Sequence, residues 1–236
     1  MLSYDTPVPV NGNHSTQTNV AATRNSMGTN PKPINATVVP VTSNNTIAKF
    51  NGQSAPKHHH IWLVTGPAGC GKSTVAKHLS SALNLPYIEG DEFHPQANID
   101  KMTNGIPLTD ADRWDWLTLL REESLRQLAS GAEGVVLTCS ALKRKYRDVI
   151  RVAPYYSHDV VLHFIYLHAP EDVLLERVGM RQGHYMGANM VHSQFSILEP
   201  PTAEETDVIS VDVSGSMEEV KREALDKVLQ KIDDVA

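Results

Sequence analysis

The residues with the clearest chemical signature form one short run, Gly66 to Ser73, which reads Gly-Pro-Ala-Gly-Cys-Gly-Lys-Ser. This run matches the pattern G-x-x-x-x-G-K-[ST] at every fixed position, a pattern typical of loops that bind nucleotide phosphates. Its glycines let the backbone curl so that successive N–H groups converge on phosphate oxygens. We expect Lys72 to reach the β and γ phosphates and act in catalysis, and Ser73 to bind Mg²⁺. The predicted ATP and phosphate contacts in this run and directly after it are Gly66, Pro67, Ala68, Gly69, Cys70, Gly71, Lys72, Ser73 and Thr74.

The flanking segments fit the same interpretation. An apolar run at 61–65 predicts a buried strand before the loop, and apolar residues at helical spacing over 72–83 predict a helix after it. Three classes then compete: a small-molecule kinase, a GTPase or motor-type NTPase, and a nucleotide-sensing binding module. The sequence holds no Asn-Lys-x-Asp motif for guanine. The apolar run at 135–139 is followed by Ser140 and Ala141, not by the acid that a motor ATPase needs.

Two carboxylates, Glu89 and Asp91, follow the next short apolar run at 86–88. On an extended segment, residues two apart point the same way, so both carboxylates would face the mouth of the sheet. We expect Asp91 to orient and deprotonate an acceptor hydroxyl, and Glu89 to reach Mg²⁺ through water. The plainer alternative is that Asp91 caps a helix or stabilises a turn.

The elements that must position these residues alternate along the chain. Continuous apolar runs predict strands at 61–65, 86–88, 135–139, 161–167 and 208–213. Between and after them, helical spacing predicts helices at 72–83, 112–129, 143–151, 171–178 and 217–233, with Asp172 and Ser216 as caps. This alternation predicts a doubly wound α/β fold with a parallel five-stranded sheet flanked by helices. Its binding site would lie beyond the carboxyl ends of the strands.

Composition divides the 236 residues into two parts. In residues 1–57, Asn, Thr, Ser, Pro and Gly supply 31 positions, which predicts a disordered extension. Residues 58–236 are expected to form the folded domain. The net charge of −6 argues against nucleic acid as a partner. The sequence has two cysteines and shows neither a secretion signal nor an apolar run long enough for a membrane span, so no membrane partner and a cytoplasmic location are expected.

Several later blocks are more specific than the phosphate-binding loop. They are Gly90-Asp91 with His94-Pro95, Asn98 and Lys101-Met102; Gly105-x-Pro107-Leu108-x-Asp110-x-Asp112-Arg113-x-x-Trp116-Leu117; Cys139-Ser140-Ala141-Leu142-Lys143-x-x-Tyr146-Arg147-Asp148; and Arg177, Arg181-x-Gly183-His184 and Ser193-Gln194-Phe195.

With these blocks, the chain from about Ile61 onward resembles the gluconokinases of the small thermoresistant type, P-loop kinases with an adenylate-kinase-like fold. The resemblance implies a lid, an acceptor-binding flap, and ATP- and Mg²⁺-dependent phosphorylation of D-gluconate to 6-phosphogluconate, feeding the pentose phosphate route. A homodimer is a further family expectation. The chain has Glu89 where the family usually has Asp.

The resemblance also assigns residues to roles. Arg177 and Arg181 would belong to the lid, with a loop at 179–192. One arginine would lie against adenine and the other on the phosphates, and Arg181 is the one expected to act in catalysis. The acceptor would be held by Asp91, His94, Arg113, Lys143 and Arg147, with Arg147 on the gluconate carboxylate. The alternatives are a shikimate-kinase-like or nucleoside-monophosphate-kinase-like activity and a nucleotide-binding regulator without catalysis.

Overall fold

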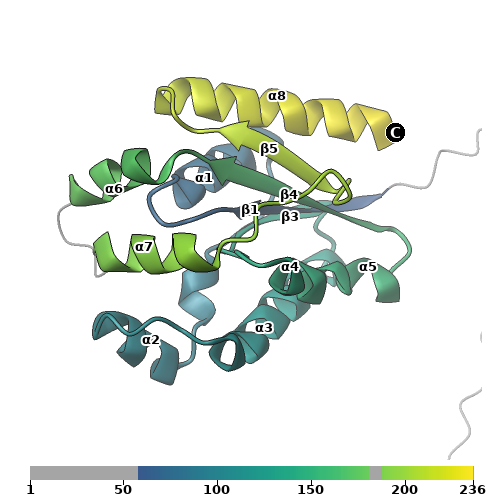
Figure 1. Cartoon of the computed structure of the whole chain (residues 1–236). Helices are drawn as coiled ribbons and strands as arrows, with labels where there is room; N and C mark the ends of the chain where they lie inside the picture. Colours follow the sequence, from purple (N-terminus) through teal and green to yellow (C-terminus); the bar gives the residue numbers. More distant parts are fainter. Residues whose placement is uncertain (1–57, 181–187, 236) are drawn as a thin grey trace, which may run out of the picture. The chain divides into compact units, whose positions relative to one another are not determined.

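Five parallel strands form the centre of the protein in the order β2-β3-β1-β4-β5. They are β1 (His59–Thr65), β2 (Tyr87–Ile88), β3 (Gly134–Thr138), β4 (Val160–His168) and β5 (Val208–Asp212). The computed structural model describes residues 58–180 and 188–235, so the predicted extension at 1–57 and the predicted lid residue Arg181 lie outside the described residues. The predicted parallel five-stranded sheet is confirmed (Figure 1).

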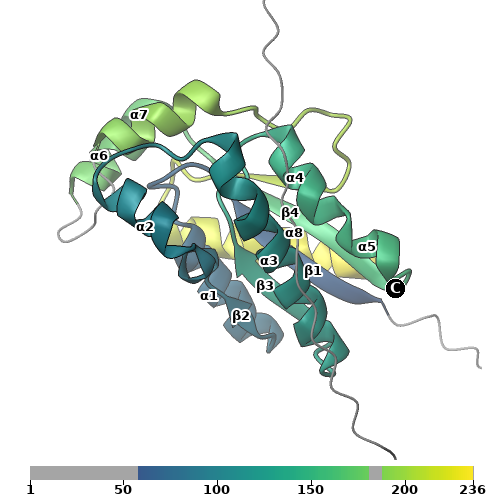
Figure 2. The ribbon, with the colours of Figure 1, turned by 90° about the horizontal axis from the view of Figure 1, so that it is seen from below.

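Helices cover both faces of this sheet. The structure contains α1 (Lys72–Leu83), the 3-10 helix η1 (Gly90–Phe93), α2 (Gln96–Thr103), α3 (Asp110–Ala129), α4 (Arg144–Arg151), α5 (Ala153–Tyr156), α6 (Glu171–Gly179), α7 (Ala188–Ile197) and α8 (Met217–Val235). In Figure 1, α8 lies above the sheet and α3, α4 and α5 lie below it, and Figure 2 shows the same three helices in front of the strands. None of the described helices combines the length and the apolar character needed to span a bilayer.

Strand β1 separates two hydrophobic cores. Trp62 and Val64 belong to the core that includes α1 and α8, whereas Ile61 and Leu63 belong to the core that includes α3 and α4. All four side chains are completely buried. Alternate residues of a strand point to opposite faces, so a strand covered on both sides must be apolar throughout. This explains the unbroken apolar run from which the strand was predicted.

Some local predictions need correction. The segment 179–192 was expected to be a loop, but α7 already begins at Ala188, and α2 was not predicted at all. Helix α6 has Pro170 rather than Asp172 at its cap position. Ser216 does cap α8, because its hydroxyl accepts a hydrogen bond from the Glu219 N–H while the Glu219 carboxylate accepts one from the Ser216 N–H. Helices α2, α6 and α7 gather beyond the carboxyl ends of the strands (Figures 1 and 2).

Arg147, which was predicted to bind the acceptor carboxylate, is buried inside the domain and paired with another residue. Its Nε and Nη2 each donate to a carboxylate oxygen of Glu205 at 2.7 Å, and its Nη1 donates to the backbone oxygens of Ala141 and Glu199. Arg147 is 1% exposed and Glu205 is 6% exposed. Arg147 lowers the pKa of Glu205 to about 2 despite burial of the carboxylate, and Arg151 adds a second partner. The guanidinium is therefore engaged in this pair, and Arg147 is not among the residues that line the pocket beside the phosphate-binding loop.

We expect Arg147→Met to lower the free energy of unfolding by about 3 kcal/mol. The substitution leaves the buried Glu205 carboxylate with Arg151 as its remaining charged partner. Arg144→Met is the matched control on the same helix. Its partner Glu204 is exposed, so the expected loss is below about 1 kcal/mol. Urea denaturation of the three proteins measures both losses, and equal losses would contradict the special role of the buried pair.

Candidate active site

The phosphate-binding loop has the backbone conformation that its glycines allow. Gly69 and Gly71 have positive φ angles of 87° and 93°, and Gly66 has 137°. A Cβ at Gly66 would lie 2.3 Å from the Leu167 oxygen, so β4 leaves no room for a side chain there. The Lys72 Nζ donates to the Gly66 and Pro67 oxygens at 3.0 Å each and so lies along the loop. The loop thus presents its backbone N–H groups and one ammonium group at the start of α1.

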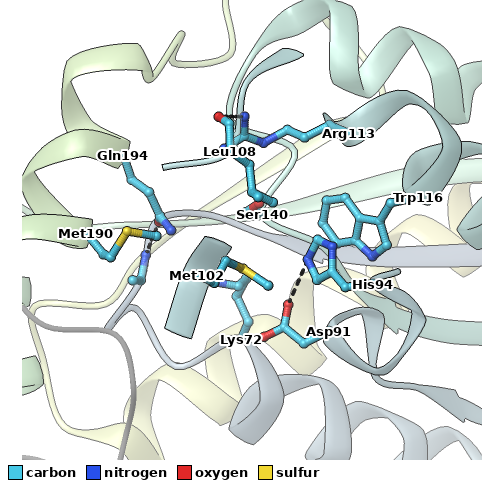
Figure 3. A pocket seen from close by; sticks show the side chains of 11 residues that line it. Lys72, Asp91, His94, Met102, Leu108, Arg113, Trp116, Ser140, Met190 and Gln194 are labelled. Atoms are coloured by element: carbon cyan, nitrogen blue, oxygen red, sulfur yellow. Dashed lines mark hydrogen bonds and ion pairs between the residues drawn. The ribbon is translucent and has the colours of Figure 1, made fainter. Parts of the chain in front are cut away.

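A pocket adjoins this loop at the carboxyl ends of the strands (Figure 3). Of the predicted site residues it brings together Ala68, Lys72, Asp91, His94 and Arg113. Helices α2 and α7 contribute Met102 and Met190, which pack with Leu108 in a small apolar cluster of their own. The complete lining is Ala68, Lys72, Asp91, His94, Met102, Leu108, Arg113, Trp116, Ser140, Met190 and Gln194. Ammonium, guanidinium and carboxylate groups therefore share one cavity with an apolar wall.

Asp91 reaches the pocket from the 3-10 helix η1, not from an extended strand as predicted. The preceding Gly90 is held on both sides, because its N–H donates to the Thr138 hydroxyl at 3.0 Å and its oxygen accepts from the Trp116 Nε1 at 2.7 Å. Desolvation raises the pKa of Asp91, Lys72 lowers it, and Glu89 raises it further, with a net upward shift. A carboxylate with a raised pKa is better suited to accept a proton than an ordinary one.

Glu89 lies on the other side of Gly90, among hydroxyl groups. Burial alone would raise the pKa of Glu89, but hydrogen bonds from Thr138, Tyr87 and Ser73 outweigh it, and the pKa is lowered. The carboxylate therefore stays ionised beside Ser73, the predicted Mg²⁺ ligand. Hydroxyl and carboxylate oxygens suit Mg²⁺, which keeps most of its other ligands as phosphates and waters. In the described ranges, no group of three or more His, Cys, Asp or Glu side chains could hold a metal ion by itself.

Of the two predicted acceptor-binding cations Arg113 and Lys143, only Arg113 lines the pocket. Arg113 is 7% exposed, donates from Nη1 to the Leu108 and Thr109 oxygens, and lines the pocket. Lys143, by contrast, pairs with Asp110 at 2.9 Å and does not line the pocket. Arg113 is thus the predicted acceptor-side cation that lines the same pocket as Asp91 and Lys72.

The predicted nucleotide-side arginines are placed only in part. The Arg177 Nη2 donates to the Gly215 oxygen at 3.2 Å, in the segment between β5 and α8. Arg181, Gly183 and His184 lie outside the described residues. Arg177 is absent from the pocket lining, so a contact with adenine remains a prediction.

Gln194 is a pocket residue to which the sequence assigned no role. Its Oε1 accepts a hydrogen bond from the Ala68 N–H at 2.7 Å, and the side chain is 8% exposed. This bond joins α7 to the phosphate-binding loop across 126 residues of sequence. Ser193-Gln194-Phe195 was noted as a block, but the spacing of a single polar residue on a helix does not reveal such a distant partner.

Comparisons with known proteins find relatives over most of the chain. The family model described as "AAA domain" matches residues 61–197. A probable gluconokinase of Schizosaccharomyces pombe is 45% identical over 190 residues, which cover 80% of this chain and 97% of that protein. The thermoresistant gluconokinase of Escherichia coli is 38% identical over 162 residues, covering 69% of this chain and 89% of that protein. The crystal structure of a gluconokinase from Sinorhizobium meliloti shares 40% identity with a TM-score of 0.65, covering 76% of this chain and 96% of that one.

We expect Gly90→Ala to destabilise the domain by about 1–3 kcal/mol and to displace Asp91. The new Cβ would lie 1.9 Å from the Thr138 oxygen, a backbone atom that cannot move aside cheaply. Gly179→Ala is the control, because a Cβ there meets nothing within 4 Å. Thermal unfolding compares the two variants. A Gly90→Ala protein as stable as Gly179→Ala would show that this close approach does not constrain the site.

Proposed function

The chain belongs to the gluconokinase family, and from this premise we propose that it transfers the γ-phosphoryl group of ATP to a terminal hydroxyl of D-gluconate, giving 6-phosphogluconate and ADP. One observation carries the proposal: a single cavity holds Lys72 of the phosphate-binding loop, a carboxylate suited to take a proton, and a buried arginine. Related proteins named as gluconokinases cover most of this chain at 38–45% identity, which supports the same acceptor.

The nucleotide would lie on the loop from Gly66 to Ser73. Its backbone N–H groups bind phosphate oxygens, and the Lys72 ammonium stabilises charge on the transferring group. Mg²⁺, when bound, neutralises the β and γ phosphates. Ser73 would hold it directly and Glu89 through water, in keeping with the hydrogen bond between these two side chains. Arg177 and Arg181 would complete the nucleotide side, on adenine and the phosphates.

The acceptor would lie between Asp91 and Arg113. Asp91 takes the proton of the attacking hydroxyl, and its raised pKa fits this role. Arg113 replaces Arg147 as the partner for the gluconate carboxylate, because a planar guanidinium can bind a carboxylate through two parallel hydrogen bonds. Figure 3 draws Arg113 at the top of the pocket and Asp91 at the bottom, so the two groups would hold opposite ends of the acceptor.

The direct test measures ADP release by the full chain with ATP and Mg²⁺. D-Gluconate, shikimate and nucleoside monophosphates are compared as acceptors under the same conditions. Release that depends on gluconate and exceeds the other acceptors by at least about a hundredfold in kcat/KM supports the proposal. Release with shikimate or a nucleoside monophosphate would assign the chain to another small-molecule kinase. ATP binding with no release for any acceptor would identify a nucleotide-binding regulator.

We expect Asp91→Asn to lower kcat by about 10²- to 10⁴-fold while the Kd for ATP changes little. The amide keeps the size of the carboxylate but cannot take a proton. Glu92→Gln is the control, because Glu92 is an exposed carboxylate in the same 3-10 helix. Steady-state kinetics and ATP titration measure the two quantities. A normal kcat in Asp91→Asn would remove Asp91 from the proton transfer.

We expect Arg113→Met to lower kcat/KM for gluconate by about 1.5–3 kcal/mol, chiefly through KM. The guanidinium would meet the carboxylate in the ground state and in the transition state alike. Arg126→Met on the same helix is the control, since Arg126 pairs with Glu123 near the surface. Melting temperatures of both variants separate a binding effect from unfolding. An unchanged KM for gluconate in a folded Arg113→Met protein would contradict this assignment.

A further inference from the structure

His94 is held in a fixed plane at the edge of the pocket. Its ring stacks on Trp116 with the centroids 4.0 Å apart and the planes 18° from parallel. The Trp116 indole is itself fixed, because its Nε1 donates to the Gly90 oxygen. His94 is 8% exposed, so protein atoms surround nearly all of the ring. The two ring nitrogens therefore have defined and different neighbours.

Asn98 follows His94 by four residues, in the first turn of α2, and lies at the Nδ1 side of the His94 ring. Its Nδ2 is 2.7 Å from the Asp112 backbone oxygen and 3.4 Å from the His94 Nδ1. A backbone oxygen can only accept, so the Asn98 atom that faces it must be the amide nitrogen with its two N–H groups. The second N–H is then available to donate to Nδ1 across the 3.4 Å contact, which requires Nδ1 to be the unprotonated nitrogen. In a neutral imidazole the single proton consequently lies on Nε2.

The Nε2 of His94 faces the reacting groups. It lies 3.9 Å from the Asp91 Oδ1, which is too far for a direct hydrogen bond, and His94 and Asp91 both line the pocket. One oxygen atom can lie about 2.8 Å from two atoms that are this far apart. A hydroxyl oxygen in that position would accept from Nε2–H and donate to Asp91 at the same time.

We propose that Asn98 is a positioning residue that fixes His94 in the Nε2–H form, so that His94 and Asp91 together orient the acceptor hydroxyl. The inference rests on the proposed phosphoryl transfer. The hydroxyl proton passes to Asp91, the hydroxyl oxygen forms a bond to the γ-phosphorus, and the bond from that phosphorus to the bridging oxygen breaks, releasing ADP. Nε2–H donates to one lone pair of the oxygen and leaves the other directed at phosphorus.

Burial and the charge of Arg113 outweigh the opposite effect of Asp91 and favour the neutral His94 ring. Burial, and then the positive charge of Arg113, lower the pKa of His94 to about 4. Asp91 faces the ring from η1, while Lys101 of α2 and Asp112 of α3 pair with each other at 2.6 Å. The Asn98 N–H that faces Nδ1 also opposes a second proton there. His94 therefore keeps one form through the neutral pH range.

Nitrogen-15 NMR of the histidine side chains tests the tautomer directly in the full-length protein, because the two ring nitrogens have different shifts when protonated and unprotonated. His94→Gln identifies the signals. We expect the wild-type His94 to carry its proton on Nε2 from about pH 6 to pH 8. A proton on Nδ1, or a rapid mixture of both forms, would overturn the proposal. This spectrum needs no substrate, so it decides the tautomer whether or not gluconate proves to be the acceptor.

Asn98→Asp tests the consequence for catalysis. The new carboxylate accepts instead of donating, so it draws the proton to Nδ1 and moves the NMR signature of His94. We expect kcat to fall by about ten- to a hundredfold, with the KM for ATP changed less than about twofold. Asn104→Asp makes the same exchange at the end of α2, where the exposed Asn104 Nδ2 donates to the Asp100 oxygen, and should leave both readouts unchanged. The acceptor used is the one that the ADP-release comparison identifies.

The NMR and kinetic readouts must change together. A shifted tautomer with a normal kcat in Asn98→Asp would overturn the proposal, as would equal losses of kcat in Asn98→Asp and Asn104→Asp. Thermal unfolding of each variant accompanies the kinetics. If Asn98→Asp fails to fold, the wild-type spectrum alone still decides which ring nitrogen carries the proton, and Nδ1–H would overturn the proposal.

Discussion

The close packing of Gly90 against the end of β3 is the constraint on which the site depends. The Thr138 hydroxyl accepts a hydrogen bond from the Gly90 N–H and donates one to the Glu89 carboxylate. The Trp116 indole N–H donates to the Gly90 oxygen. A residue without a side chain thus separates two carboxylates that are only two positions apart. Glu89 lies among hydroxyl groups with a lowered pKa, and Asp91 lies in the pocket with a raised one. Such a separation of pKa values is how two similar acids acquire different tasks.

The fold and the phosphate-binding loop could be predicted because their signals are local. The glycine spacing at 66–71 and the unbroken apolar run of β1 each follow from the conformation of neighbouring residues. The 3-10 helix at Asp91 was not predicted, since Glu89-Gly90-Asp91 has no pattern that distinguishes an extended segment from a tight turn. Local sequence also gave no sign of α2, which carries Asn98, although the resemblance did include that asparagine.

Long-range pairing explains the largest error. Arg147 was assigned to the acceptor because it follows β3 at the correct end of the sheet, yet its partner Glu205 lies 58 residues later. The run from Lys143 to Arg151 does not show which acidic residues elsewhere in the chain form an ion pair with each of its cations. Lys143 and Lys145 both pair with Asp110, and Arg151 pairs with Asp207. None of the cations in this run lines the pocket, whereas Arg113, which lies over the Tyr146 ring of the same run, does.

The charge of the pocket also limits the kind of acceptor it can take. With His94 neutral, the charged side chains of the lining are Lys72, Arg113 and Asp91, a surplus of one positive charge in a chain whose net charge is −6. Lys72 is engaged with the phosphate-binding loop, so the charge left for an acceptor is that of Arg113, at the other end of the pocket from Asp91 (Figure 3). Met102, Leu108 and Met190 form an apolar wall of the same pocket, and apolar surroundings strengthen an ion pair. An acceptor that carries an anionic group at one end and a hydroxyl at the other satisfies both ends of this cavity, whereas a neutral sugar would leave the charge of Arg113, which among the described residues donates only to backbone oxygens within hydrogen-bond reach, without an anionic partner.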